Sequence, residues 1–190
     1  MSFDFETTLD RRNTCSAKWD GLEEKFGIGD ASGVISMWIA DMDFACPPEI
    51  VQAVQQKVAH PAYGYCFTPP EVPEAICLWQ KKRFDLTVQP ESLVYGSGVL
   101  PILAAGLQAL TRRGEGVIIQ SPVYYPFAAT IKSSDRVVID NPLIEEERDG
   151  KLTYSSDFDN LRTVAARENV TAMIFCNPHN PAGRIWTPEE

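Results

Sequence analysis

The sequence predicts an α/β protein with a mostly parallel sheet sandwiched by helices, and two observations lead to that fold class. From residue 92 onward, short apolar runs alternate with segments whose apolar residues recur at helical spacing. Such alternation is typical of parallel sheets, because a crossover between parallel strands needs a helix-length connection. The second observation is that residues 171–175, an apolar run, end abruptly at two Asn-Pro pairs. Open α/β sheets bind their ligands at such carboxyl ends of strands.

The first part of the chain is less regular. Residues 1–33 are polar, whereas residues 34–40 are apolar enough to form a buried segment, followed by acidic residues expected to be solvated. Pro47 and Pro48 mark the start of a helix that ends near His60, with apolar residues at helical spacing. A second helix is predicted over residues 73–83.

The alternating part contains the predicted strands and the helices between them. The strands are expected at residues 92–95, 117–120, 136–139 and 171–175. One helix is expected after residue 98, a second after residue 126 and a third over residues 158–165. Asp149-Gly150 is typical of a hairpin turn between residues 144–148 and 151–154. Thr187 and Glu190 have the spacing of a capping box, which predicts a helix beginning there. We therefore expect the chain to be part of a longer protein.

Composition excludes several classes of function. The net charge of −9 argues against a nucleic-acid binder, and no apolar run approaches membrane-spanning length. The chain does not start with a basic segment and an apolar signal core. Five scattered cysteines without a Cys-X-X-Cys pattern indicate reduced thiols in a cytoplasmic protein. Two histidines without spaced partners give no metal site.

Glycines between a strand and a helix suggest a phosphate site. Gly96 and Gly98 let an anion approach the backbone, where the free N–H groups of Val99 and Leu100 and the helix dipole would hold a phosphate. The alternative is a plain turn between strand and helix. The dinucleotide fingerprint G-X-G-X-X-G is absent.

Aromatic and amide side chains occupy the neighbouring loops. Tyr124 and Tyr125 follow the next strand and would either stack on a flat ligand or close the core, and Tyr65 lies in an exposed-looking loop. Asn180 lies in the Asn-Pro segment, which would otherwise be only a turn, and Arg184 or nearby backbone would meet a carboxylate. A phosphate site, a stacking ring and an amide together outline a site for a phosphorylated aromatic cofactor, and pyridoxal phosphate fits that outline.

The residues at this point resemble a known family. The most specific stretches are residues 37–44, Met-Trp-Ile-Ala-Asp-Met-Asp-Phe, and residues 177–181, Asn-Pro-His-Asn-Pro. The chain resembles the fold-type I pyridoxal-phosphate enzymes, and within them the MalY/PatB group of cystathionine β-lyases, from Phe3 to Glu190. The resemblance implies an arm of the small domain at residues 1–45 and an incomplete large cofactor-binding domain at residues 46–190.

The resemblance also implies roles for the residues of the cofactor site. Backbone N–H groups of Val99 and Leu100, beside Gly98, would hold the phosphate of pyridoxal 5'-phosphate. Tyr124 would stack on its ring, and Asn180 would hydrogen-bond its phenolic oxygen.

A second set of residues would serve the substrate and the subunit interface. Tyr65 would reach the phosphate bound by the neighbouring subunit of a homodimer. Backbone near Ala40, together with Asn180, would contact a small amino-acid substrate. The implied reaction removes the α-proton of cystathionine or a related cysteine conjugate, releases the thiol and yields pyruvate and ammonia.

The catalytic lysine is not found in this sequence. Lysines occur at positions 18, 25, 57, 81, 82, 132 and 151, and none stands in the lysine motif of the family. We expect the Schiff-base lysine to lie beyond residue 190, so that this chain has no catalytic residue of its own and is inactive alone. The alternatives are an aminotransferase on the same scaffold and a non-catalytic, truncated pseudoenzyme.

Overall fold

The computed structural model describes residues 3–190, and its contacts divide the chain into two compact units. The first unit is Met1–Pro69 and the second is Pro70–Glu190. The division expected at residue 45 concerns the domains of a longer protein and stays a prediction. No helix within the described residues is both long and apolar enough to cross a membrane.

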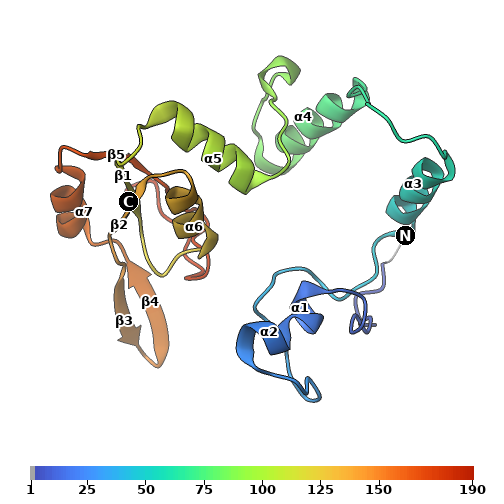
Figure 1. Ribbon diagram of the computed structural model, residues 1–190, viewed down its shortest axis with the longest axis horizontal. Helices are drawn as coiled ribbons and strands as arrows, with labels where there is room; N and C mark the ends of the chain where they lie inside the picture. The colour runs from blue at the N-terminus through green and yellow to red at the C-terminus, as the bar shows by residue number, and fades with distance from the viewer. Residues whose placement is uncertain (1–2) are drawn as a thin grey trace. The chain divides into compact units, whose positions relative to one another are not determined.

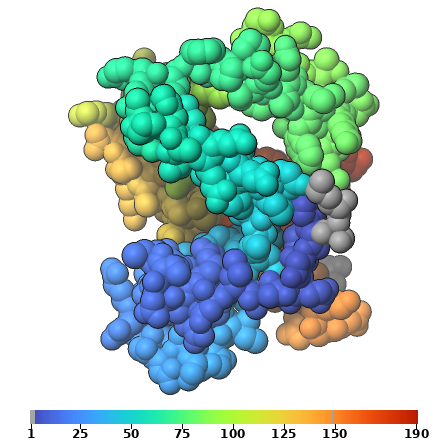
Figure 2. Space-filling view, turned by 90° about the vertical axis from the view of Figure 1, so that its right-hand side faces the viewer, coloured from blue at the N-terminus to red at the C-terminus, as the bar shows by residue number. Residues whose placement is uncertain are grey.

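The first unit contains three helices: α1 (Ala17–Asp20), α2 (Leu22–Phe26) and α3 (Pro48–Ala59). The α2 helix ends at Gly27, whose φ of 70° is the left-handed conformation that favours glycine at a helix end. Figure 2 shows the packed N-terminal part in blue. The helix predicted after Pro47 is confirmed as α3, with proline in its first turn and no buried residue.

The prediction of a buried segment at residues 34–40 is wrong for its apolar side chains. Ile35 is 83% exposed and Met37 is 86% exposed. The inward contacts are made by the alternate residues, since the Ser36 hydroxyl and the Trp38 indole N–H both donate to the Lys18 carbonyl, at 2.9 and 3.1 Å. Side chains alternate in direction along this stretch, so Ile35 and Met37 point outward while Ser36 and Trp38 point inward.

The second unit holds the remaining elements. The helical ones are α4 (Glu71–Phe84), a 3-10 turn η1 (Pro90–Ser92), α5 (Val99–Leu110), α6 (Pro126–Ser133) and α7 (Phe158–Ala165). The strands are β1 (Gly116–Ile119), β2 (Val137–Asp140), β3 (Ile144–Arg148), β4 (Lys151–Ser155) and β5 (Val170–Met173).

The sheet confirms the predicted fold class. Its order is β2-β1-β5 with both pairings parallel, and β3 and β4 form the separate antiparallel hairpin expected at Asp149-Gly150. The buried Val117 and Ile119 of β1 belong to a core with Leu107 of α5 and Ile131 of α6. The α7 helix contacts β5, and Figure 1 draws α6 and α7 on either side of the strands. Both faces of the sheet are therefore covered, as in other parallel sheets.

The strand predicted at residues 92–95 is not formed. Residues 90–92 are the 3-10 turn, and Val94 is 89% exposed. A strand needs a neighbour for its backbone hydrogen bonds, and among the described residues no strand lies beside this segment.

A buried arginine joins the carboxyl ends of α5 and α6. Arg136 donates from Nε to the Thr111 hydroxyl at 2.9 Å and from a terminal nitrogen to the Thr111 carbonyl at 2.6 Å, just beyond the end of α5. Its other terminal nitrogen donates to the Ser134 carbonyl at the end of α6. The guanidinium thus donates hydrogen bonds to the carboxyl ends of both α5 and α6.

Candidate functional site

The loops that follow β1 and β5 are paired with each other. Val123 and Pro181 form an isolated antiparallel bridge. Tyr124 directly follows one residue of this bridge, and Asn180 directly precedes the other. Two of the residues expected to contact a cofactor ring are therefore brought together at the carboxyl edge of the sheet.

Tyr124 is anchored by its neighbours and still reaches the surface. Its ring packs at 85° to that of Phe127, with centroids 5.5 Å apart, and Tyr124 is 37% exposed. Tyr125 is more exposed and has the N-cap position of α6. Of the two tyrosines named from the sequence, Tyr124 is the one held in a fixed orientation with accessible surface.

The N-terminus of α5 presents two backbone donors. Gly98, the N-cap, has φ of 151°, a conformation that side chains other than glycine rarely adopt. Pro101 has no N–H, and the Ile102 N–H donates to the Gly98 carbonyl at 3.3 Å. The first-turn donors without an intrahelical partner are therefore those of Val99 and Leu100, at the positive end of the helix dipole.

Gly96 is required for a different reason. A Cβ added there would lie 2.6 Å from Cγ1 of Ile102, so the segment before α5 leaves no room for a side chain. Both glycines of the Gly-Ser-Gly connection thus serve the local geometry of the helix start. This geometry also suits a plain turn, and the free amides are what make it a candidate anion site.

The Asn-Pro segment is closed by a buried histidine that sequence reasoning did not single out. His179 is 1% exposed, and its Nε2 lies 3.1 Å from the Gln120 carbonyl and 3.0 Å from the Pro122 carbonyl. Its backbone N–H donates to the Arg184 carbonyl at 2.7 Å. A histidine in a polar turn gives no periodic signal of burial, so its role was not visible before the fold.

Arg184 is engaged within the same turn. It forms an ion pair with Glu190 and its guanidinium lies 4.7 Å from the centroid of the Trp186 ring. Glu190 also accepts from the Thr187 N–H, and this hydrogen bond, followed by the charge of Arg184, lowers the pKa of Glu190. The Glu190 N–H donates in turn to the Thr187 hydroxyl at 3.3 Å, so the expected capping box is formed.

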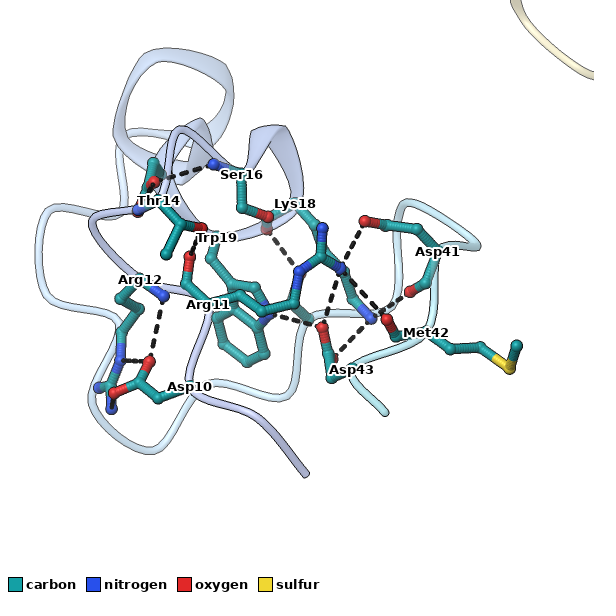
Figure 3. A network of polar contacts seen from close by, with 12 residues as sticks. Asp10, Arg11, Arg12, Thr14, Ser16, Lys18, Trp19, Asp41, Met42 and Asp43 are labelled. Carbon is teal, nitrogen blue, oxygen red and sulfur yellow. Dashed lines mark hydrogen bonds and ion pairs between the residues drawn. The ribbon is translucent and has the colours of Figure 1, made fainter. Parts of the chain in front are cut away.

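The first unit contains a polar network around one carboxylate (Figure 3). Asp43 accepts from Lys18 at 2.8 Å, from the Trp19 indole N–H at 3.1 Å and from Arg11 at 3.2 Å. The Lys18 hydrogen bond is the main cause that lowers the pKa of Asp43. The expectation that this carboxylate is solvated is therefore wrong, because donors from residues 11–19 surround it.

Two predicted residues of the first unit lie at the surface. Ala40 is exposed and directly precedes Asp41, whose carbonyl accepts from Lys18 at 2.8 Å and whose carboxylate pairs with Arg11 at 2.5 Å. Tyr65 is fully exposed in a segment without helix or strand. Both are accessible to a ligand or a second subunit, and their roles remain predictions.

The fold and these loops define an α/β protein with a candidate ligand site at the carboxyl edge of a parallel sheet. The family described as aminotransferase class I and II matches residues 32–190, and the chain belongs to that family. It is 39% identical over 186 residues to cystathionine beta-lyase PatB of Bacillus subtilis, covering 98% of this chain and 46% of PatB. It is 32% identical over 189 residues to protein MalY of Escherichia coli, covering 99% of this chain and 47% of MalY.

A solved structure agrees with the family assignment. Cystalysin from Treponema denticola, whose crystal structure contains pyridoxal 5'-phosphate, superimposes with a TM-score of 0.85 at 34% identity, covering 100% of this chain and 47% of cystalysin. The chain thus spans about half the length of the relatives it matches. Its fold is a truncated form of the fold-type I architecture expected from the sequence.

Proposed function

We propose that the chain is part of a pyridoxal-phosphate-dependent carbon–sulfur β-lyase that acts on cystathionine or related cysteine conjugates. The products would be a thiol, pyruvate and ammonia. The observation that carries the proposal is the Val123–Pro181 bridge, which pairs the Tyr124 loop with the Asn180 turn beyond the end of β1. The two amides without an intrahelical partner at the start of α5 support it. Relatives named as cystathionine β-lyases, PatB among them, support the reaction class.

The residues present fit the cofactor at its phosphate end. The Val99 and Leu100 N–H groups would donate to phosphate oxygens, since Ile102 already uses its N–H internally and Pro101 has none. Gly98 would allow the anion to approach the backbone without a side chain in its way. The helix dipole of α5 would add to the attraction.

The ring end fits the paired loops. Tyr124 would stack on the pyridine ring, and the Asn180 amide would donate to the phenolic oxygen. When bound, pyridoxal phosphate supplies an electron-withdrawing ring that accepts the charge left by removal of an α-proton. The task of this chain is then to bind and orient that ring and to exclude water from one of its faces.

Residues of the first unit would complete the site in a homodimer. Backbone near Ala40 would bind the substrate carboxylate, and Asn180 would also contact the substrate. The exposed Tyr65 would reach the phosphate bound by the neighbouring subunit.

Free cysteines in the described residues support a cytoplasmic location.

We further propose that the Schiff-base lysine comes from outside these 190 residues. The three site segments, residues 96–100, 120–126 and 176–184, contain no lysine. The chain alone should therefore form no pyruvate from cystathionine with added cofactor, whereas the full-length protein of which it is a part should form pyruvate and thiol in equal amounts. Steady pyruvate formation by the purified 190-residue chain would contradict this division of roles.

An aminotransferase is the second candidate, because the matching family is named for that activity. The same cofactor site serves both reactions, so the two differ in what happens to the substrate sulfur. The full-length protein should release thiol from cystathionine when no keto acid has been added to the reaction. Dependence of amino-group loss on an added keto acid, without thiol release, would favour the aminotransferase.

A further inference from the structure

The imidazole of His179 links two loops that are far apart in the chain. Its two partners, the carbonyls of Gln120 and Pro122, belong to the segment that follows β1, 59 and 57 residues away in sequence. Carbonyl oxygens only accept hydrogen bonds, so Nε2 must carry a hydrogen. The Nδ1 atom is buried without a partner among the described residues. The polar contact of the ring is therefore a forked hydrogen bond, in which Nε2 donates to both carbonyls.

The histidine ring is held from behind. The Trp186 ring lies against it at 86°, with centroids 5.5 Å apart. Trp186 is itself fixed by donating from Nε1 to the Cys176 carbonyl at 3.0 Å and from its backbone N–H to Asn177 at 3.3 Å. A side chain packed in this way has one rotamer, so the forked hydrogen bond holds the two loops at a defined spacing.

The two loops in question are those that carry Tyr124 and Asn180. The Val123–Pro181 bridge lies next to both residues, and outside the strands it is a single bridge rather than a ladder. One bridge alone fixes little, so the His179 hydrogen bonds are the main additional restraint. We propose that His179 is a positioning residue that sets the spacing between Tyr124 and Asn180, and hence the orientation of the cofactor ring. This inference rests on the proposed function.

A conservative replacement of His179 tests the role of its Nε2 hydrogen-bond donor. The amide nitrogen of glutamine reaches the place of the histidine Nε2, so His179→Gln should retain the forked hydrogen bond. His179→Leu keeps an apolar side chain against Trp186 and removes the donor. His60, the other histidine of this chain, is exposed at the end of α3, and His60→Gln is the matched control.

The first measurement is the affinity of each full-length variant for pyridoxal phosphate and for inorganic phosphate, without turnover. His179→Leu should bind pyridoxal phosphate about tenfold more weakly, because a lost buried hydrogen bond has that effect. It should bind inorganic phosphate like the wild type, since Val99 and Leu100 are not touched. His179→Gln should restore the affinity for the cofactor, and the visible absorbance band of the bound cofactor should shift only in His179→Leu.

The second measurement is amide hydrogen exchange in residues 121–126 and 177–184, which does not depend on any ligand. Exchange should rise in both segments of His179→Leu and remain normal in His179→Gln and His60→Gln. Unchanged exchange, or equal loss of affinity for cofactor and phosphate, would overturn the positioning role and leave the proposed function intact. A wild-type protein that does not bind pyridoxal phosphate would overturn the proposed function and, with it, the positioning role.

Discussion

At the scale of single residues, several buried or half-buried side chains make polar contacts between distant parts of the sequence. His179 bonds to a carbonyl 59 residues earlier, and Lys18 bonds to Asp43, 25 residues later. Buried polar groups of this kind are costly unless they are paired, so each one specifies the local arrangement of the chain around it. A change in the partner should then affect the fold of the unit as well as any ligand.

Asp43 offers a test of this coupling through pH. Hydrogen bonds from Lys18 and Trp19 lower its pKa, so the ionised form stabilises the folded unit. That stability is present above the ordinary carboxyl pKa of about 4 and is lost as pH falls through the lowered value. Asp43→Asn should therefore lower the melting temperature at neutral pH and flatten its decline below about pH 4.

The measurement is thermal unfolding of wild type and variants across that pH range, followed by tryptophan fluorescence. Asp159→Asn is the control, because Asp159 forms only an exposed ion pair with Arg162. A variant at position 43 that keeps the wild-type profile would show that the carboxylate adds nothing to stability.

At the scale of elements, glycine is favoured at the start of α5 but not in its interior. Gly98 has a backbone conformation that other residues adopt only under strain, whereas Gly106 lies inside the helix and a Cβ there would meet no atom within 4 Å. The same substitution should consequently have opposite effects at two positions eight residues apart in one helix.

Gly98→Ala should lower stability by about 1–3 kcal/mol and weaken binding of inorganic phosphate, because the strained N-cap moves the Val99 and Leu100 amides. Gly106→Ala should raise stability by about 0.5–1 kcal/mol and leave phosphate binding unchanged. Denaturant unfolding and phosphate titration of both variants measure these effects. Normal phosphate affinity in Gly98→Ala would argue against an anion site at this helix.

The accuracy of the sequence predictions also differs between elements. The β1, β2 and β5 strands and the hairpin were predictable because their neighbours are present and their patterns are strong. Residues 92–95 and 34–40 have equally apolar sequences, but the described chain provides no strand partner for Val94 and no cover for Ile35 or Met37. Periodicity reports what a segment can bury, and it does not report whether the covering element lies in the same chain.

The candidate site was predictable to a similar extent. Tyr124 and Asn180 were predicted to serve one site because loops at the carboxyl ends of parallel strands share an edge. The pairing of their loops, the burial of His179 and the engagement of Arg184 by Glu190 depend on turn geometry. Hydrogen bonds of that kind have no repeating pattern in the sequence, so only the fold reveals them.

At the scale of the whole molecule, the described surface includes large apolar faces. The outward residues of α3 are Ile50, Val51, Val54 and Val58, and all four are exposed. Monomeric soluble proteins seldom expose such a contiguous apolar stripe. The 190-residue chain should therefore self-associate more readily than the full-length protein in which these faces would be covered.

This prediction is tested by light scattering of the chain across a range of concentrations. Val54→Lys and Val58→Lys together should reduce association without unfolding α3, because both residues point to solvent and lysine is a good helix former. Glu49→Lys, at the start of the same helix, is the control for added positive charge. A wild-type chain that stays monomeric at high concentration would refute the expectation.

The order of the strands in the sheet has a consequence for how the chain is made on the ribosome. The β1 strand pairs with β2, which follows it closely, and with β5, which is synthesised after the other described strands. The 33 residues that follow Asp140, up to and including Met173, take roughly 2 to 7 s to synthesise at ordinary rates of translation. During that interval one side of β1 has no strand beside it, while the local hairpin of β3 and β4 is able to close. The nascent chain therefore passes through a stage in which β1 is paired with β2 along one edge only. We expect a chaperone to bind the apolar β1 strand during that stage.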